Sequence, residues 1–530
     1  MEAQQTMLSL EVASSTVVGL VIAVIVILIG RVANWVWVRP KRLERCLRRQ
    51  NLKGNSYRPV FGDLKEMGHM VQVAKSKPIN LDDNIIPRVL PFHHQLIQNY
   101  GKNSFMWFGP NPVVTIMNPE DVKEVFTNIS VFQKIPTNSL TKPLITGLVG
   151  YEGEKWMKHR RIINPAFHFE KLKLMLPAFY ESCNEMVEKW MRLASESQRN
   201  YCEVDVWPFF QSMTSDVISR TAFGSSFEEG RHTFQLQSEQ ILLTLKVLRS
   251  VYIPGWRFVP SKLNRRLKEI DKEMKVLVRG IIHKREKARE EGLAPSDDLL
   301  DILLESNRRE IKDNSNNKNM GMSIEDVIEE CKLFYLAGQE TTSVLLNWTI
   351  ILLCKYPSWQ SQAREEVFQV FGTQRPHYDG LSHLKLVSMI LYEALRLYPP
   401  APMLDRIVAK DAKLGSLSLP TGTRVGIPVI LVQQDPELWG DDAKEFNPVR
   451  FCEGISTEPK NPASYLPFGW GPRICLGQKF SLLEAKMALS LILQHFSFEL
   501  SPSYVHAPLL ALTIHPQYGT HIILQKLSNY

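Results

Sequence analysis

The hydrophobic pattern begins with one apolar segment that is long enough to cross a membrane. No residue between Glu11 and Arg31 is charged, and residues 17–29 are nearly continuous Val, Ile and Leu. These nineteen uncharged residues would rise about 28 Å as a helix, close to the hydrocarbon thickness of a bilayer. A cleavable signal peptide needs a basic region before the apolar run and a small-residue cleavage site after it, and neither is present. The pattern therefore predicts a retained membrane helix.

Positive charge follows this segment but does not precede it. Residues 31–50 contain seven Lys or Arg against one Glu, whereas no Lys or Arg precedes Arg31. The positive-inside rule places basic flanks on the cytosolic side. We therefore expect residues 1–30 to be a lumenal tail and transmembrane anchor, residues 31–55 a basic linker, and residues 56–530 one cytosolic domain.

In that domain, helical periodicity outweighs strand periodicity. Residues 105–108 and 113–117, joined by Gly-Pro-Asn-Pro, predict an early hairpin, and helical patterns dominate from Tyr151 onward. Ser323 and Asp326 have the spacing of a capping box before an apolar helix that reaches about Lys355. The fold class is therefore α+β and predominantly helical. Further expected elements are a polar loop at 307–322, helices at 383–398 and 478–494, and strands at 414–419 and 424–430.

Composition and charge narrow the class of protein. Hydrophobic residues make up 44% and charged residues 22%, which allows a large core and excludes a disordered or multi-pass membrane protein. The net charge of +8 comes largely from residues 31–50, so the domain gives no case for nucleic acid binding. The seven cysteines are widely spaced without a CxxC pair, which indicates neither a disulfide framework nor a zinc site.

One cysteine has unusual neighbours. Residues 467–477 read Pro-Phe-Gly-Trp-Gly-Pro-Arg-Ile-Cys-Leu-Gly and lead directly into a helical pattern. At a helix start, the dipole and unpaired N–H groups favour the thiolate of Cys475, which is a metal ligand. Arg473 can pair with a carboxylate, and Phe468 can shield the sulfur from water. Taken alone, such a loop is more often a helix cap with an inert cysteine.

The complete spacing FxxGxRxCxG resembles the haem-thiolate loop of the cytochrome P450 superfamily. The resemblance implies the cytochrome P450 fold and haem b as cofactor, with Cys475 as axial ligand of the iron. It also implies that Phe468, Gly469 and Arg473 contribute to cofactor binding.

The predicted long helix carries a second match. Ala337-Gly338-Gln339-Glu340-Thr341-Thr342 resembles the oxygen-activation motif of the same family. Ala337 and Gly338 leave room beside the iron, and Thr341 can donate its hydroxyl hydrogen to the Ala337 carbonyl four residues back. Glu340 and Thr341 are then the expected catalytic residues, which relay protons during oxygen activation. Without the cysteine loop, a small-residue helix crossing with a solvated Glu is the simpler interpretation.

Two further motifs match positions that the resemblance assigns to structure. Glu393 and Arg396 stand three apart on one helix face, as in the family's ExxR motif, and Arg450 is placed to complete their network. Val449 replaces an acidic residue common in the family, and Gln433-Gln434 occupies a place where related plant enzymes often have His. Both departures raise the question of whether local packing and activity are intact.

Three more residues match cofactor-contacting positions. Trp156 and Arg160 form a WxxxR pattern one helical turn apart, and Arg406 lies ten residues beyond Arg396. The resemblance assigns all three to the haem propionates. A surface-paired or snorkelling arginine is the alternative for each arginine.

Over about residues 100–525, the chain is most similar to plant microsomal enzymes related to secologanin synthase, a group that includes gibberellin and triterpenoid oxidases. The signatures at 252–258, 439–443 and 482–486 carry this narrower resemblance. It implies an endoplasmic reticulum enzyme that oxidises a terpenoid. The apolar segments 136–150, 401–404 and 510–514 are the expected pocket walls, although core packing explains them equally well.

The electrons must come from another protein. The sequence contains neither GxGxxG after a strand nor GxxxxGK[ST], so we find no site for a nicotinamide or nucleotide. The expected partner is an NADPH-dependent cytochrome P450 reductase, and the chain uses NADPH only indirectly. Lys155, Lys158 and Lys479 are candidate docking residues, although any one of them is more simply a solvated lysine.

The sequence thus predicts a membrane-tethered monooxygenase that hydroxylates or further oxidises an apolar plant metabolite with O2. Two alternatives remain. One is a haem-thiolate synthase or isomerase that needs no reductase, against which the intact Glu340-Thr341 pair argues. The other is a non-enzymatic haem sensor or ligand carrier, which Val449 and the Gln pair would favour.

Overall fold

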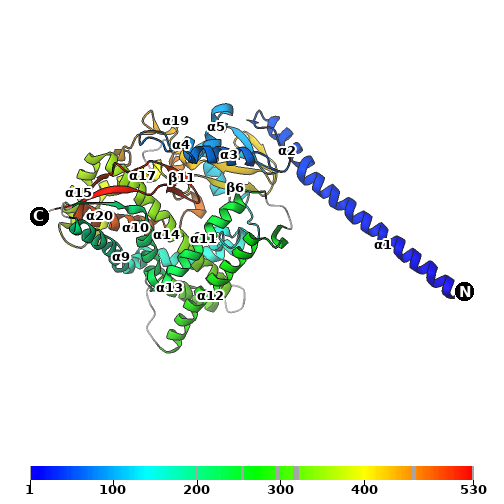
Figure 1. Ribbon diagram of the computed structural model, residues 1–530, viewed down its shortest axis with the longest axis horizontal. Coiled ribbons are helices and arrows are strands. Elements are labelled where there is room, and N and C mark those ends of the chain that lie inside the picture. The colour runs from blue at the N-terminus through cyan, green and yellow to red at the C-terminus, as the bar shows by residue number, and fades with distance from the viewer. Residues whose placement is uncertain are drawn as a thin grey trace.

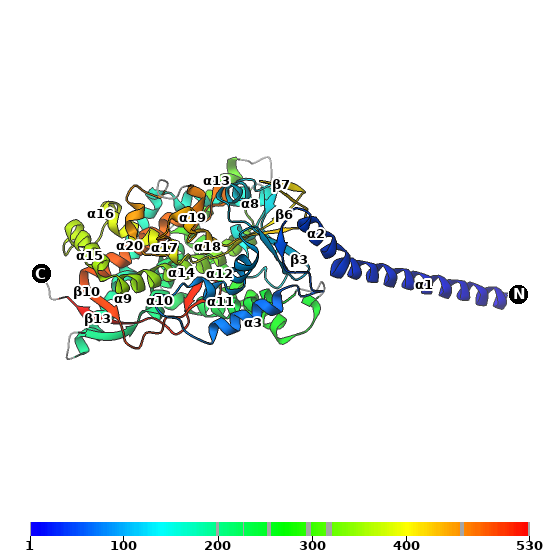
Figure 2. The same ribbon diagram turned by 90° about the horizontal axis from the view of Figure 1, so that it is seen from above.

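The computed structural model describes residues 2–197, 201–225, 227–251, 256–292, 298–313, 321–455 and 461–527. A long helix, α1 (Glu2–Ala33), projects from a globular body (Figures 1 and 2). Its apolar side chains from Val17 to Ile29 are 49–66% exposed. It is long and apolar enough to cross a membrane, which suggests a membrane anchor.

The basic segment after α1 is helical and packs onto the body. A π-helical turn (Asn34–Val38) leads into α2 (Arg39–Arg48), whose Leu43 and Leu47 are buried. Arg39 Nη1 donates to Asn111 Oδ1 at 3.0 Å. On sequence alone, the many charged residues of this segment favour a linker and obscure the apolar pair Leu43 and Leu47. These two residues are four apart and therefore lie on one helix face.

The body is predominantly helical, as the sequence predicted. Its largest apolar cluster includes most of the buried side chains of α14, a long helix that lies inside the body (Figure 1). The helices are α3 (Leu64–Lys75), α4 (Ile86–Val89), α5 (Pro91–Tyr100), α6 (Pro119–Thr127), α7 (Gly147–Gly150), α8 (Gly153–Ile163), α9 (Phe169–Glu196), α10 (Val206–Phe223), α11 (Phe227–Leu248), α12 (Lys262–Glu290), α13 (Leu299–Asp313), α14 (Ile324–Lys355), α15 (Pro357–Phe371), α16 (Tyr378–His383), α17 (Lys385–Leu397), α18 (Val429–Val432), α19 (Pro436–Trp439) and α20 (Gln478–His495).

Small sheets lie at the edges of this helical body. The largest has six strands in the order β1-β2-β3-β9-β6-β4, and a second has the order β10-β13-β5. Two hairpins, β7–β8 and β11–β12, complete the described strands. The strands are β1 (Lys53–Gly54), β2 (Ser104–Phe108), β3 (Asn111–Thr115), β4 (Phe132–Gln133), β5 (Tyr201–Asp205), β6 (Leu404–Val408), β7 (Ala412–Leu414), β8 (Leu417–Leu419), β9 (Arg424–Ile427), β10 (Phe496–Leu500), β11 (Pro508–Leu510), β12 (Ile514–Pro516) and β13 (His521–Lys526).

The strongest local signals are confirmed. Ser323 Oγ accepts from the Asp326 N–H at 3.1 Å, and the Asp326 carboxylate accepts from the Ser323 N–H at 3.1 Å, so the predicted capping box starts α14. The predicted hairpin forms as β2 and β3. The helices expected before Pro399 and after Gly477 form as α17 and α20.

Three local predictions were wrong. The strand expected at 414–419 is a tight hairpin, because Gly415 adopts a φ of +54° between β7 and β8. The strand expected at 424–430 ends at Ile427, and α18 follows Pro428. The polar loop expected at 307–322 begins inside α13, where buried Asn307 binds both backbone groups of Met322. Residues 314–320 of that loop, and Tyr252 to Gly255, lie outside the described residues.

Candidate haem-thiolate site

The cysteine loop is a compact turn that leads into α20. The Cys475 N–H donates to the Phe468 carbonyl at 2.9 Å, and the Gly469 N–H donates to the Leu466 carbonyl at 2.9 Å. Gly469 and Gly471 adopt φ values of +73° and +69°, which favour glycine. A Cβ on Gly471 would lie 2.7 Å from the Phe126 carbonyl oxygen, so this glycine also permits close contact with α6.

The environment of the Cys475 thiol contains opposing effects. Burial raises the pKa of Cys475, although backbone N–H groups of Gly477 and Gln478 and the charge of Arg160 act to lower it. Although nearby protein groups desolvate the thiol, the residue is exposed at a hollow of about 330 Å³ that Arg160 and Lys479 also line. The predicted helix, α20, does begin just after Cys475. Its N–H groups, however, lower the pKa of the thiol by less than burial raises it. A bound metal cation deprotonates a coordinating thiol, and such a cation would complete this site.

The middle of α14 is partly exposed, whereas the parts of the helix on either side are buried. Ala337 is exposed, whereas almost every residue of α14 from Val327 to Tyr335 and from Thr342 to Leu353 is buried. Thr341 Oγ1 donates to the Ala337 carbonyl at 2.8 Å, which is the bond that the sequence predicted. The helix therefore presents a small side chain and a hydroxyl at its open turn.

Gly338 lies in close contact with α10. A Cβ at this position would lie 2.7 Å from two side-chain atoms of Ile218 on α10. Thr214 Oγ1 also donates to the Gln339 carbonyl at 3.0 Å. Gly338 thus permits the close approach of α10, and Ala337 is the most exposed residue of this turn.

Glu340 is not a solvated side chain. It is 4% exposed, and its Oε1 accepts from Thr513 Oγ1 at 2.7 Å and from His515 Nε2 at 2.5 Å. Burial alone would raise its pKa, but the His515 and Thr513 contacts bring the pKa of Glu340 below its ordinary value. This buried carboxylate is therefore held in its ionised form. Neither Thr513 nor His515 could be connected to Glu340 from sequence spacing, because the pairs are about 175 residues apart.

A group of buried cations lies beside the cysteine loop. Arg473 donates to Glu152 at 2.5 Å and stacks 4.3 Å from the Trp156 ring centroid, while Arg160 donates to the Ile474 carbonyl at 2.9 Å. Arg406 is 3% exposed and donates only to its neighbour, the Asp405 carbonyl, at 2.8 Å. Within the described part of the chain, the Nε atoms of Arg406 and Arg473 have no hydrogen-bond partner.

Burial and mutual repulsion set the electrostatics of this group. Burial, followed by the charge of Arg473, lowers the pKa of Arg406 to about 10. Burial also lowers the pKa of Lys134 to about 7, with further lowering by the charges of Arg406 and Arg473. We call Lys134, Arg160, Arg406 and Arg473 the cation cluster. Sequence reasoning missed Lys134, because a lone lysine after a short strand carries no spacing signal.

The cation cluster fits an anionic group. Its nearby acids, Glu152 and Asp405, leave an excess of positive charge and the two unpaired Nε atoms described above. Carboxylates such as the haem propionates match both the charge and the unused donors. The residues present thus fit haem on two sides, through the Cys475 sulfur and through these cations.

The Glu393–Arg396 pair of the ExxR motif is satisfied by the protein itself. Arg396 is fully buried and makes two 2.7 Å contacts with the Glu393 carboxylate, from Nε and Nη2. Its remaining donors bind the carbonyls of Ala443, Gln433 at 2.8 Å and Glu445 at 2.9 Å. Arg450 lies 3.5 Å from Glu393 and donates to the Trp439 carbonyl at 3.0 Å. We call Glu393, Arg396 and Arg450 the ExxR network.

Neither departure from the family pattern weakens this network. Gln433 Nε2 donates to the carbonyls of Leu395 and Arg396 at 3.0 and 2.9 Å, and its Oε1 accepts from the Leu466 N–H at 2.7 Å. Gln434 Nε2 donates to the Leu397 carbonyl at 2.8 Å. Val449 is 49% exposed, so no buried charge is lost there. Gln433 in fact ties α17 to the start of the cysteine loop.

The three candidate docking lysines differ in the contacts that they make. Lys155 pairs with Asp326 at 2.6 Å and lies 4.1 Å from the Tyr151 ring centroid, and Lys158 donates to the Gly321 carbonyl at 2.9 Å. Lys479 lies with Cys475 at the hollow. Of the three, Lys479 is the one placed beside the candidate iron ligand.

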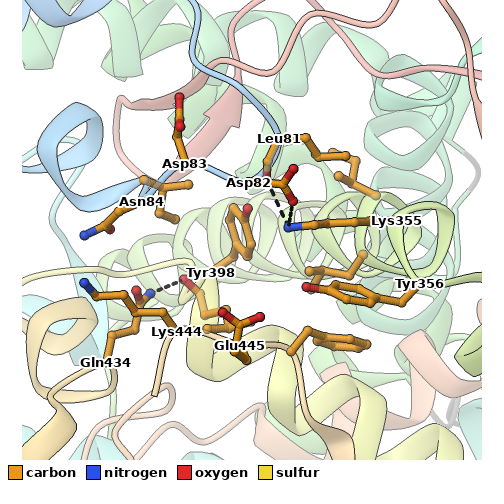
Figure 3. Close-up of a pocket in the computed structure, with 15 residues that line it drawn as sticks. Leu81, Asp82, Asp83, Asn84, Lys355, Tyr356, Tyr398, Gln434, Lys444 and Glu445 are labelled. Atoms are coloured by element: carbon orange, nitrogen blue, oxygen red, sulfur yellow. Dashed lines mark hydrogen bonds and ion pairs between the residues drawn. The ribbon is translucent and has the colours of Figure 1, made fainter. Parts of the chain in front are cut away.

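A second cavity, of about 290 Å³, is lined by other residues than Cys475, Glu340 and the cation cluster (Figure 3). Its polar wall includes Lys355, which pairs with Asp82 at 2.7 Å, together with Tyr398 and Gln434. None of the expected apolar pocket walls lines it. The apolar tip of the β11–β12 hairpin, residues 510–512, is instead half-buried, next to Thr513 and hence to Glu340.

Known proteins resemble this chain over nearly its whole length. The family described as Cytochrome P450 matches residues 67–518. Cytochrome P450 CYP72A219 of Panax ginseng is 56% identical over 506 residues, which cover 95% of this chain and 97% of that protein. Cytochrome P450 72A15 of Arabidopsis thaliana is 55% identical over 514 residues, which cover 97% and 99%. Cytochrome P450 716A67 of Medicago truncatula is 56% identical over 497 residues, which cover 94% and 95%.

Proposed function

This chain belongs to the cytochrome P450 family and is a monooxygenase, and from that premise we propose that it oxidises an apolar plant terpenoid with electrons from an NADPH-dependent reductase. The observation that carries the oxidase chemistry is the arrangement of Cys475 and the cation cluster around one site. The half-buried apolar tip at residues 510–512 supports an apolar guest near Glu340.

In this proposal, the Cys475 thiolate and the cation cluster would hold haem b. Trp156 supports the Arg473 guanidinium, and Phe468 and Gly469 shape the loop that presents the sulfur. When bound, haem supplies the activation of O2 and the insertion of one oxygen atom into a carbon–hydrogen bond.

Thr341 and Glu340 on α14 would transfer protons. Thr341 keeps its hydroxyl hydrogen on the Ala337 carbonyl, which leaves its oxygen free to accept another hydrogen bond. Glu340 is held as a carboxylate and can accept and release a proton. Together they would deliver protons at the open turn of α14, while the buried flanks of the helix exclude water.

Other parts of the chain would attach the enzyme to the membrane and contact the reductase. Residues 1–30 would form the lumenal tail and transmembrane anchor in the endoplasmic reticulum, residues 31–55 the basic connection to it, and residues 56–530 the cytosolic haem domain. Lys479 would face the reductase, because it lies at the hollow beside Cys475.

The test is turnover of a terpenoid panel by microsomes that contain this protein and a plant reductase. We expect NADPH-dependent appearance of products heavier by one oxygen atom, with 18O incorporated from 18O2. Microsomes with Cys475→Ala should give none. Products that form without NADPH would favour an isomerase, and binding without any product would favour a carrier.

A further inference from the structure

Glu340 receives two side chains from the C-terminal hairpin. Thr513, in the turn between β11 and β12, and His515, on β12, both donate to the same oxygen, Oε1, at 2.7 and 2.5 Å. The Glu340 side chain is 5% exposed, so these two contacts replace the water that an ionised carboxylate requires.

His515 connects this buried carboxylate to the surface. Its side chain is 24% exposed, although its Nε2 contacts a nearly inaccessible oxygen. The Trp207 ring at the start of α10 lies 5.2 Å from the imidazole, centroid to centroid. The imidazole therefore has one end on Glu340 and another part in contact with solvent.

The surroundings of His515 offer it one acidic partner. On α14 that partner is Glu340, and the opposite strand β11 places Leu509 across from it. The nearest acid at α10 is its N-cap Asp205, which binds the Trp207 N–H at 3.2 Å and the Thr520 N–H at 2.7 Å. Among the described residues, Glu340 is the only carboxylate within ion-pair distance of His515.

The resting state of Glu340 creates a need for a proton donor. The carboxylate is ionised, so it must gain a proton before it can deliver one. Thr341 does not supply this proton, because its hydroxyl hydrogen lies on the Ala337 carbonyl. His515 Nε2, in contrast, donates its hydrogen bond directly to Glu340 Oε1.

We propose that His515 is a positioning residue that protonates Glu340 from the solvent side, and that Thr513 fixes the receiving oxygen; this deepens, and rests on, the proposed function. In the step, the Nε2–H bond of the imidazolium breaks and an O–H bond forms on Oε1, which leaves a neutral imidazole and a neutral carboxylic acid. The neutral acid then gives this proton to a water molecule on the Thr341 side of the helix, and Glu340 returns to a carboxylate. The imidazole, which keeps its hydrogen on Nδ1, regains a proton at Nε2 from the solvent, so charge and protons balance over the cycle.

The variants His515→Gln and His515→Phe separate proton donation from orientation. Glutamine still offers an N–H to Glu340 but carries no transferable proton, whereas phenylalanine keeps only the ring against Trp207. We expect both to lower the fraction of NADPH electrons recovered in product by roughly tenfold, with the remainder recovered as hydrogen peroxide. Thr513→Val should lower it by about threefold, because Glu340 keeps its donor but loses an orienting bond.

His521→Gln is the matched control. His521 is also a partly exposed histidine of the C-terminal region, but its acidic neighbour is Glu203, 3.8 Å away, and not Glu340. Its coupling ratio should equal that of the unchanged protein.

A measurement that does not depend on turnover tests the contact itself. In the full chain carrying haem in lipid nanodiscs, labelled with 15N-histidine, the Nε2–H signal assigned to His515 by its loss in His515→Gln should move in Glu340→Gln. It should stay in place in His521→Gln.

A coupling ratio unchanged in His515→Gln would overturn proton donation, and an Nε2–H signal that does not respond to Glu340→Gln would overturn the contact. Failure of the proposed function is separate. It would appear as no thiolate-type carbon monoxide spectrum or no NADPH-coupled product in the unchanged protein, and the NMR measurement would still decide whether His515 binds Glu340.

Discussion

The ExxR network and the cation cluster both contain buried arginines. They differ in how far protein groups accept the hydrogen bonds of those arginines. In the ExxR network, every guanidinium nitrogen of Arg396 binds the Glu393 carboxylate or a backbone carbonyl. In the cation cluster, Arg406 makes one bond to a neighbouring carbonyl and its Nε has no partner among the described residues.

The difference teaches which group is structural and which is built for a ligand. A buried ion pair is tolerated when its remaining donors are satisfied, and the Glu393–Arg396 pair meets that condition from the protein alone. In the cation cluster, the charges of Arg406 and Arg473 repel each other, and the excess positive charge suits an anion. Burial of charge by itself does not distinguish Arg396 from Arg406, whereas the number of hydrogen bonds that each guanidinium makes to the protein does.

Glu393→Gln should have the largest effect on stability. The substitution leaves Arg396 without its counter-charge in a fully buried position, which costs about 3–5 kcal/mol for a broken buried pair. Chemical unfolding of the haem-free protein would measure the loss. The surface pair Arg58–Glu66, with side chains 58% and 37% exposed, gives the control: Arg58→Gln should change stability by about 1 kcal/mol or less. Equal losses in both variants would remove the distinction between a buried network and an ordinary pair.

Arg406→Gln should show the opposite pattern. Because the haem-free cluster is self-repulsive, we expect the free energy of unfolding without haem to stay within about 1 kcal/mol or to rise. Haem retention should fall by roughly tenfold, because a charge-assisted bond is lost. Haem transfer to apomyoglobin would measure the retention. A haem-free protein as damaged as that of Glu393→Gln would mean that Arg406 belongs to the structural group.

The pH dependence of haem-free stability should report Lys134. Its folded pKa of about 7 lies below the ordinary value of 10.5, so the unfolded chain binds more protons between these values. Stability without haem should therefore rise as the pH increases from about 7 toward 10.5, and Lys134→Met should flatten that part of the curve. Bound carboxylates would favour the charged amine, so haem loading should flatten it as well. A slope that survives in Lys134→Met would assign it to another group.

Val449→Asp should have the smallest effect. The side chain is 49% exposed and lies beside the ExxR network without completing it, so restoring the acid common in the family should change stability by about 0.5 kcal/mol or less. Thermal unfolding would detect a larger change, and a gain above about 1 kcal/mol would show that the network is incomplete as it stands.

Local signals in the sequence predicted much of this architecture. The capping box at Ser323, the proline after α17 and the Gly-Pro-Asn-Pro turn each depend on neighbours within a few residues. The bond from Thr341 to the Ala337 carbonyl is predictable for the same reason, because four residues make one helical turn.

The remaining features depend on contacts between distant segments. Gly338 meets Ile218, Glu340 meets His515, and Lys134 joins arginines from β6 and the cysteine loop. The effect of burial on the Cys475 thiol also required the fold, since the helix start alone predicted the opposite direction. A linear motif names the residues of such a site but not the partners that tune them.

Thiolate ligation by Cys475 is tested most directly by the carbon monoxide difference spectrum of the reduced protein. The unchanged protein and Cys452→Ser, which alters the other exposed cysteine, should give the absorption band characteristic of a haem thiolate. Cys475→Ser should abolish that band. A band that survives in Cys475→Ser, or that disappears in Cys452→Ser alone, would contradict the assignment of Cys475 as the ligand.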